Sequence, residues 1–206
     1  SPLIIINVKI KYIYYNEGRI YICLIIYNFN TKWGFSKEAL EAPTTMPERW
    51  NWVNIPHTWN NIDGQDGGND LYRGTAFYAK ELEKMDLPKA DRYFLEIQGA
   101  NSSAILSTGE KSGILFKAFE KLLANHDGGY STWRVDITDA LEDKNLFVFE
   151  VDNSQNDRVY PQNADFTFYG GIYRDLNIIA VSESHFDLEY YGTPGIKVTP
   201  EVVGKD

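Results

Sequence analysis

Hydrophobic and polar residues alternate along several short stretches of the chain, which is typical of β-strands with one buried face. The clearest alternation covers residues 50–55 and stops at Pro56, because proline cannot donate to a central strand ladder. Residues 146–151 instead form an almost continuous apolar run, as in a strand buried on both faces. We expect strands over residues 50–55, 75–82, 92–97, 104–106, 146–151 and 176–181.

One segment departs from this pattern, because its apolar residues fall at helical spacing (Leu115, Phe116, Phe119, Leu122 and Leu123). It predicts a short helix within residues 115–125. Elsewhere glycine and proline turns separate the strands, and residues 60–70 form a polar, glycine-rich loop. Several short strands and a single weak helix together predict an all-β protein, folded as an antiparallel sandwich.

The first thirty residues differ in composition from the rest, with many Ile, Tyr and Asn. They are compatible with one or two strands, for example over residues 20–27. We expect residues 1–29 to form a leader that is not native to the domain behind it. The apolar run is broken by Lys9, Lys11 and Arg19, so it predicts neither a membrane span nor a secretory signal.

Charge and cysteine content exclude several classes of function. The formal net charge of −9 disfavours nucleic acid and anionic membranes as partners, since both are bound through Lys and Arg. Cys23 is the only cysteine, so no internal disulfide can form and a cysteine-based metal site is not expected. His57 and His126 have no nucleophile or second histidine at catalytic spacing. We expect structural histidines, no metal, no cofactor and a cytoplasmic protein.

The most informative run of the chain is DFTFYGGIYRD, over residues 165–175. It places the Asp165 carboxylate beside aromatic rings and a glycine pair. Aromatic faces cover the C–H side of a sugar ring, and a carboxylate accepts hydrogen bonds from its hydroxyls. The alternative is a structural aspartate that pairs with Arg174 or Arg158, or that caps a turn. We expect Arg73, Arg174 and Asp175 to form structural pairs.

The run at 165–175 resembles the end of the sugar-binding domain of glycoside hydrolase family 2, the β-galactosidase and β-glucuronidase group. A second block, PHTWN at 56–60 followed by Asp63-Gly64 and by YRG at 72–74, resembles the start of that domain. The resemblance implies a jelly-roll sandwich of the galactose-binding type over residues 30–181. Residues 182–206 would then connect to an immunoglobulin-like domain and a catalytic TIM barrel.

The same resemblance implies which residues contact the sugar. The family's aspartate at the position of Asp165 extends into the catalytic pocket of the barrel. Asn69 and Asp70 match the far end of a loop that reaches the same pocket. Both catalytic glutamates of the family lie in the barrel, so this chain carries no catalytic residue and is expected to be inactive alone.

The expected function is therefore that of the amino-terminal domain of a β-galactosidase-like hydrolase, which completes the pocket for a β-galactoside and supports domain assembly. The full-length enzyme would be compatible with a homo-oligomer. Two alternatives remain open. One is a free-standing, lectin-like carbohydrate-binding module, and the other is an inactive, truncated gene product.

Overall fold

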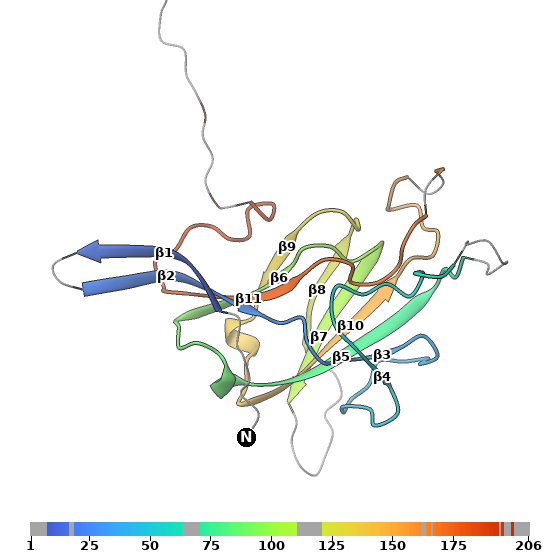
Figure 1. The fold of residues 1–206 in the computed structure, drawn as a ribbon, viewed down its shortest axis with the longest axis horizontal. Coiled ribbons are helices and arrows are strands. Elements are labelled where there is room, and N and C mark those ends of the chain that lie inside the picture. The colour runs from blue at the N-terminus through green and yellow to red at the C-terminus, as the bar shows by residue number, and fades with distance from the viewer. Residues whose placement is uncertain are drawn as a thin grey trace, which may run out of the picture.

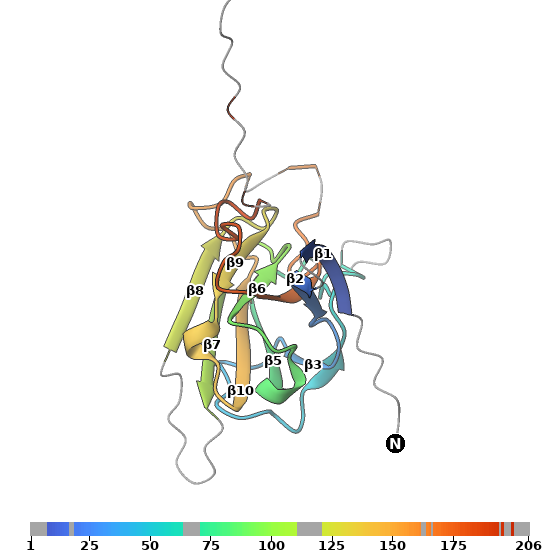
Figure 2. The ribbon, with the colours of Figure 1, turned by 90° about the vertical axis from the view of Figure 1, so that its left-hand side faces the viewer.

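The chain folds into two antiparallel sheets that lie face to face, as the sequence predicted (Figures 1 and 2). The structure is a computed structural model that describes residues 8–16, 19–63, 71–110, 121–161, 164–165, 167–193, 195 and 199. One sheet has the order β1 (Val8–Asn16), β2 (Arg19–Asn28), β11 (Leu176–Val181), β6 (Arg92–Ile97) and β9 (Trp133–Asp136).

The second sheet has six strands. Their order is β4 (Asn51–Val53), β3 (Trp33–Ser36), β5 (Thr75–Glu83), β10 (Lys144–Asp152), β7 (Ser103–Glu110) and β8 (Lys121–Asp127). Within the described ranges the helical turns are two 3-10 turns, at Lys84–Asp86 and Thr138–Ala140. None of the described helical segments has the length and apolar character needed to cross a bilayer. The all-β, antiparallel sandwich is confirmed, while its assignment to the jelly-roll type remains a prediction.

The run of apolar residues in β10 is buried on both faces, as expected. Phe147 and Phe149 face the other sheet, where Phe147 meets Phe29 at a ring distance of 5.5 Å. Leu146 and Val148 face the opposite way and form a second cluster, packed against Ala39, Ala42, Met46 and Trp50. The segment between β3 and β4 therefore covers the outer face of this strand.

The helix expected within residues 115–125 is wrong over its last part, because residues 121–125 belong to β8. Residues 111–120 lie outside the described part of the chain. The register explains the misleading pattern: Leu106 lies opposite Ala124 and Ser107 opposite Leu122, so Leu123 is an extra residue in the ladder. A β-bulge interrupts the period-two alternation of a strand, and the consecutive leucines at 122 and 123 lie at this interruption.

The amino-terminal strand β2 is part of the sheet. It pairs with β11, with Leu24 opposite Val181 and Asn28 opposite Asn177, so the strand expected over residues 20–27 is confirmed. Among the described strands, β1 pairs with β2 alone, and the resulting hairpin projects from the body of the molecule (Figure 1). The division of the chain at residue 29 and the origin of the leader remain predictions.

A buried ion pair holds the segment after β11 against the sheet. The Arg134 guanidinium lies 2.7 Å from the Glu96 carboxylate and also donates to the carbonyls of Leu188 and Thr193. Burial alone would raise the pKa of Glu96, but hydrogen bonds from Gln98, Arg134 and Asn177 and the nearby charge of Arg134 lower it. This carboxylate therefore stays ionised inside the fold.

Candidate functional site

The two motif blocks, about a hundred residues apart in the sequence, lie against each other at one end of the sandwich. The backbone N–H of His57 donates to the carbonyl of Ile172 at 2.8 Å. The backbone N–H of Gly170 donates to the side-chain oxygen of Asn60 at 2.7 Å. The first block therefore forms the support on which the loop after Asp165 rests.

The glycine pair in the second block is required by this close packing. A Cβ at Gly170 would lie 2.1 Å from Cζ2 of the Trp59 ring, which has no room to move. Gly171 has a φ of +118°, a conformation that side chains rarely adopt, and a Cβ there would lie 2.5 Å from the His57 carbonyl. Both glycines are therefore explained by the fold.

Two buried asparagines connect the loops of this end. The Asn60 amide donates to Asp63 at 2.6 Å and to the Tyr72 carbonyl at 2.8 Å, while its oxygen accepts from Gly170 and from the Asn153 amide. Asn153 also donates to the Phe168 carbonyl at 3.1 Å and accepts from the Gly74 N–H at 2.9 Å. Both side chains are buried, with exposed fractions of 1% and 2%. Their amides supply hydrogen bonds to backbone groups of loops that are not paired in a sheet.

The histidines have structural roles, as expected. The Tyr78 hydroxyl forms a hydrogen bond with Nδ1 of His57 at 2.8 Å and accepts a second one from the Ile172 backbone. Burial lowers the pKa of His57, so the ring is neutral at pH 7. His126 stacks on Trp133 and contacts the Ser131 hydroxyl at 2.9 Å. Within the described ranges no group of three His, Cys, Asp or Glu side chains is placed to hold a metal.

Asp165 is exposed. Its two candidate ion-pair partners are engaged elsewhere. The Arg158 guanidinium lies 2.8 Å from Asp127, and the Arg174 guanidinium donates to the Tyr130 carbonyl. In the described part of the chain, no hydrogen bond or ion pair joins Asp165 to another residue. Its carboxylate is therefore available to a ligand, and its role in binding stays a prediction.

The other predicted contacts, Asn69 and Asp70, lie outside the described residues. The chain on both sides of residues 64–70 is held together, because Asp63 accepts from the Tyr72 N–H at 3.0 Å. Arg73, expected in a structural pair, lies 4.7 Å from the ring centre of Phe168. Asp175, for its part, accepts from the Asn30 amide at 2.9 Å. All of these contacts tie loops together.

Sequence reasoning missed the buried amides of Asn101 and Asn153. Asn101 donates to the Tyr169 carbonyl at 2.9 Å and so fixes the backbone of an aromatic residue that is 47% exposed. An exposed carboxylate and an exposed ring four residues apart, on a loop held from below by amides, form a surface that can bind a sugar.

Comparison with known proteins gives this arrangement a family. No family model matches the chain. A β-glucuronidase of Bacteroides fragilis is 33% identical over 153 residues, which are 73% of this chain and 21% of that protein. A β-galactosidase of Thermoanaerobacter pseudethanolicus is 22% identical over 197 residues, covering 88% of this chain and 25% of that protein.

Solved structures agree with these relatives. The FMN-binding β-glucuronidase from Facaelibacterium prausnitzii L2-6 matches with a TM-score of 0.70 and 36% identity, over 86% of this chain and 26% of that one. A putative β-galactosidase from Bacteroides fragilis matches with a TM-score of 0.70 and 30% identity, over 89% and 27%. The chain thus spans about a fifth to a quarter of the length of these relatives. It belongs to the β-glucuronidase and β-galactosidase group of glycoside hydrolase family 2, of which it matches the amino-terminal region.

Proposed function

We propose that the chain is the amino-terminal sugar-binding domain of a family 2 glycoside hydrolase and forms one wall of its substrate pocket. The observation that carries the proposal is the exposed Asp165 carboxylate, which has no ion-pair partner in the described part of the chain. A carboxylate at this place accepts hydrogen bonds from two hydroxyls of a terminal sugar. The catalytic barrel and an immunoglobulin-like domain would be its partners.

The substrate class is a terminal β-glycoside. We predicted a β-galactoside from the sequence of residues 169–175, and β-galactosidases are among the relatives. A β-glucuronide is the second candidate, because β-glucuronidases are more numerous among the curated relatives. Asp165 would contact ring hydroxyls that both sugars carry, so the choice between them depends on groups outside this chain.

The isolated chain is expected to hydrolyse neither substrate. Retaining hydrolysis requires two carboxyl groups about 5 to 5.5 Å apart, one as acid and base and the other as nucleophile. In this family both come from the barrel. As a pocket wall alone, the chain should bind galactose or glucuronic acid only in roughly the millimolar range. Micromolar affinity would instead support the lectin-like alternative.

A chimera tests the proposal directly. In the Bacteroides fragilis β-glucuronidase, the matching segment is deleted or replaced by this chain, and hydrolysis of nitrophenyl β-glucuronide and β-galactoside is measured. We expect the deletion to be inactive and the replacement to restore turnover. A monodisperse chimera that is as inactive as the deletion would contradict the proposed role.

A further inference from the structure

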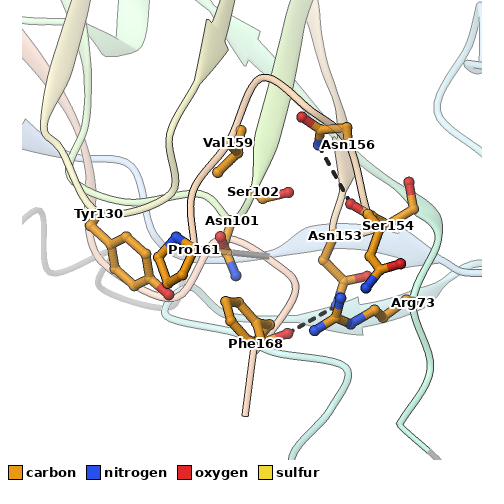
Figure 3. A pocket seen from close by; sticks show the side chains of 11 residues that line it. Arg73, Asn101, Ser102, Tyr130, Asn153, Ser154, Asn156, Val159, Pro161 and Phe168 are labelled. Carbon is orange, nitrogen blue, oxygen red and sulfur yellow. Dashed lines mark hydrogen bonds between the residues drawn. The ribbon is translucent and has the colours of Figure 1, made fainter. Parts of the chain in front are cut away.

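A cavity opens among the loops that precede β11, but it is too small for a sugar. Its lining includes Asn101, Asn153 and Phe168, and its volume is about 20 Å³ (Figure 3). That is room for one water molecule. This cavity therefore offers no second place for a saccharide.

The segment that follows β11 presents a different surface. In Figure 1 this segment, drawn in red, lies well apart from the orange loops that precede β11. The chain turns back on itself here, because a Cβ at Gly195 would lie 2.4 Å from the carbonyl oxygen of Asp187. Compact surface loops whose ends touch in this way are frequently functional.

The loop is fixed to the sheet from below. Leu188 is buried and packs with side chains of β6 and β11. Arg134 donates to the carbonyls of Leu188 and Thr193 at 2.9 and 2.7 Å. Gly192 lies against the chain before β9, where a Cβ would come within 2.1 Å of the Thr132 carbonyl. The backbone is thus held on both sides of residues 190 and 191.

The tip of this loop holds a tyrosine in an unfavourable backbone conformation. The Thr193 N–H donates to the Tyr190 carbonyl at 3.0 Å and closes a β-turn. The two central residues of the turn, Tyr191 and Gly192, have φ values of +49° and +63°, where glycine, asparagine and aspartate are usual. Such a φ is strained for a bulky side chain, and strained residues are concentrated at functional sites.

The turn presents both of its tyrosine rings to solvent. Tyr191 is 84% exposed and Tyr190 is 36% exposed, and the two rings meet edge to face with their centres 5.0 Å apart. Neither hydroxyl has a hydrogen-bond partner in the described part of the chain. Packing within the domain therefore does not explain why a tyrosine occupies the strained position.

The surroundings of the two rings favour a saccharide over other ligands. Glu189 is exposed, and its carboxylate has no hydrogen-bond or ion-pair partner among the described residues. A protein interface would bury this charge, and interfaces are depleted in Asp and Glu, while the net charge of −9 disfavours nucleic acid. An aromatic face for C–H groups, next to a carboxylate that accepts from hydroxyls, is suited to a sugar.

We propose that Glu189, Tyr190 and Tyr191 form a second saccharide-binding surface. The Tyr191 ring covers one face of a neutral sugar unit, and the Glu189 carboxylate accepts hydrogen bonds from its hydroxyls. Asp165 lies on another loop, so this surface does not depend on the function proposed for Asp165.

The test is an NMR titration of the complete 206-residue chain with galactotetraose and with cellotetraose, two neutral β-linked tetrasaccharides. We expect the backbone signals of residues 189–193 to shift, with an affinity of roughly millimolar order. Tyr191→Asn removes the ring and suits the left-handed backbone. It should weaken the binding by about fivefold to tenfold, while the melting temperature stays the same or rises. Tyr191→Phe is the matched control, because it keeps the aromatic face and should keep the affinity within about twofold.

Three results would overturn the inference. The first is that neither tetrasaccharide shifts the signals of residues 189–193. The second is that the Tyr191→Asn chain binds as tightly as wild type. The third is that this variant melts several degrees lower, since the ring would then serve the fold.

The outcomes also separate this inference from the proposed function. Asp165→Asn should leave the signal shifts of residues 189–193 unchanged. An inactive chimera together with a responsive tyrosine turn would overturn the proposed function alone. An active chimera together with an unresponsive turn would overturn only the second surface.

Discussion

Replacing Asn60 by alanine should destabilise the domain strongly, because this one amide joins three loops. The substitution removes the hydrogen bonds to Asp63, Tyr72, Gly170 and Asn153. Some partners keep another bond: Asp63 still accepts from the Tyr72 N–H, and Asn153 still donates to the Phe168 carbonyl. The buried N–H of Gly170 loses the only acceptor that it has in the described part of the chain.

The magnitude follows from these losses. An unsatisfied buried N–H costs about 1 to 3 kcal/mol, and the lost bond to the Asp63 carboxylate about 1.5 to 3 kcal/mol. We expect a total of roughly 3 to 5 kcal/mol, a large part of the roughly 5 to 15 kcal/mol that stabilises a typical domain. The loss of the other hydrogen bonds of Asn60 adds less to the cost, because some of their partners keep a further hydrogen bond.

Urea unfolding, followed by tryptophan fluorescence, measures this effect as a lower midpoint at unchanged slope. The matched control is Asn54→Ala, at an exposed asparagine that accepts a single bond from the Lys32 N–H. We expect the control to cost about 0.5 kcal/mol. If Asn60→Ala were as mild as the control, the asparagine network would not be what holds these loops together.

Three further substitutions test other parts of the account. Gly170→Ala should cost several kcal/mol or prevent folding, because its Cβ would overlap the Trp59 ring; a melting temperature close to wild type would refute this. Arg134→Met should cost about 3 to 5 kcal/mol in urea unfolding, since Glu96 would stay buried without its cation; a cost below about 1 kcal/mol would contradict it. Because burial holds the pKa of His57 below its ordinary value of 6.5, the unfolded chain takes up that proton first. Stability should therefore fall as the pH drops below about 6.5, and His57→Gln should reduce the fall; an unchanged pH profile would count against this.

The regular strands could be predicted because their local pattern agrees with their final surroundings. The strands β6 and β11 cover the predicted residues, and β10 extends the predicted run by a few residues at its ends. The strand β8 could not be predicted, because the extra residue Leu123 gives it a helical spacing that only pairing with β7 overrides.

The candidate site was only partly accessible from the sequence. The two motif blocks lie against each other, and the glycines of the second block are needed for its packing against Trp59 and His57. Asn153 carries no local signal, because its partner Asn60 is 93 residues away in the sequence. Whether Asp165 forms an ion pair depends on where Arg174 and Arg158 find their partners. The sequence alone left both arginines as candidates. Contacts between distant loops decide all of these points.

The central claim is that Asp165 acts on the sugar and not on the fold. The most direct measurement is a comparison of Asp165→Asn with wild type in the chimeric enzyme, with turnover and melting temperature determined on the same samples. Losing a charge-assisted hydrogen bond that tightens in the transition state is worth roughly 3 kcal/mol, so kcat should fall by about a hundredfold or more. The melting temperature should stay almost unchanged, because the carboxylate is exposed and an amide fits the same space. Near-normal turnover together with a collapsed melting temperature would show that Asp165 is a structural carboxylate.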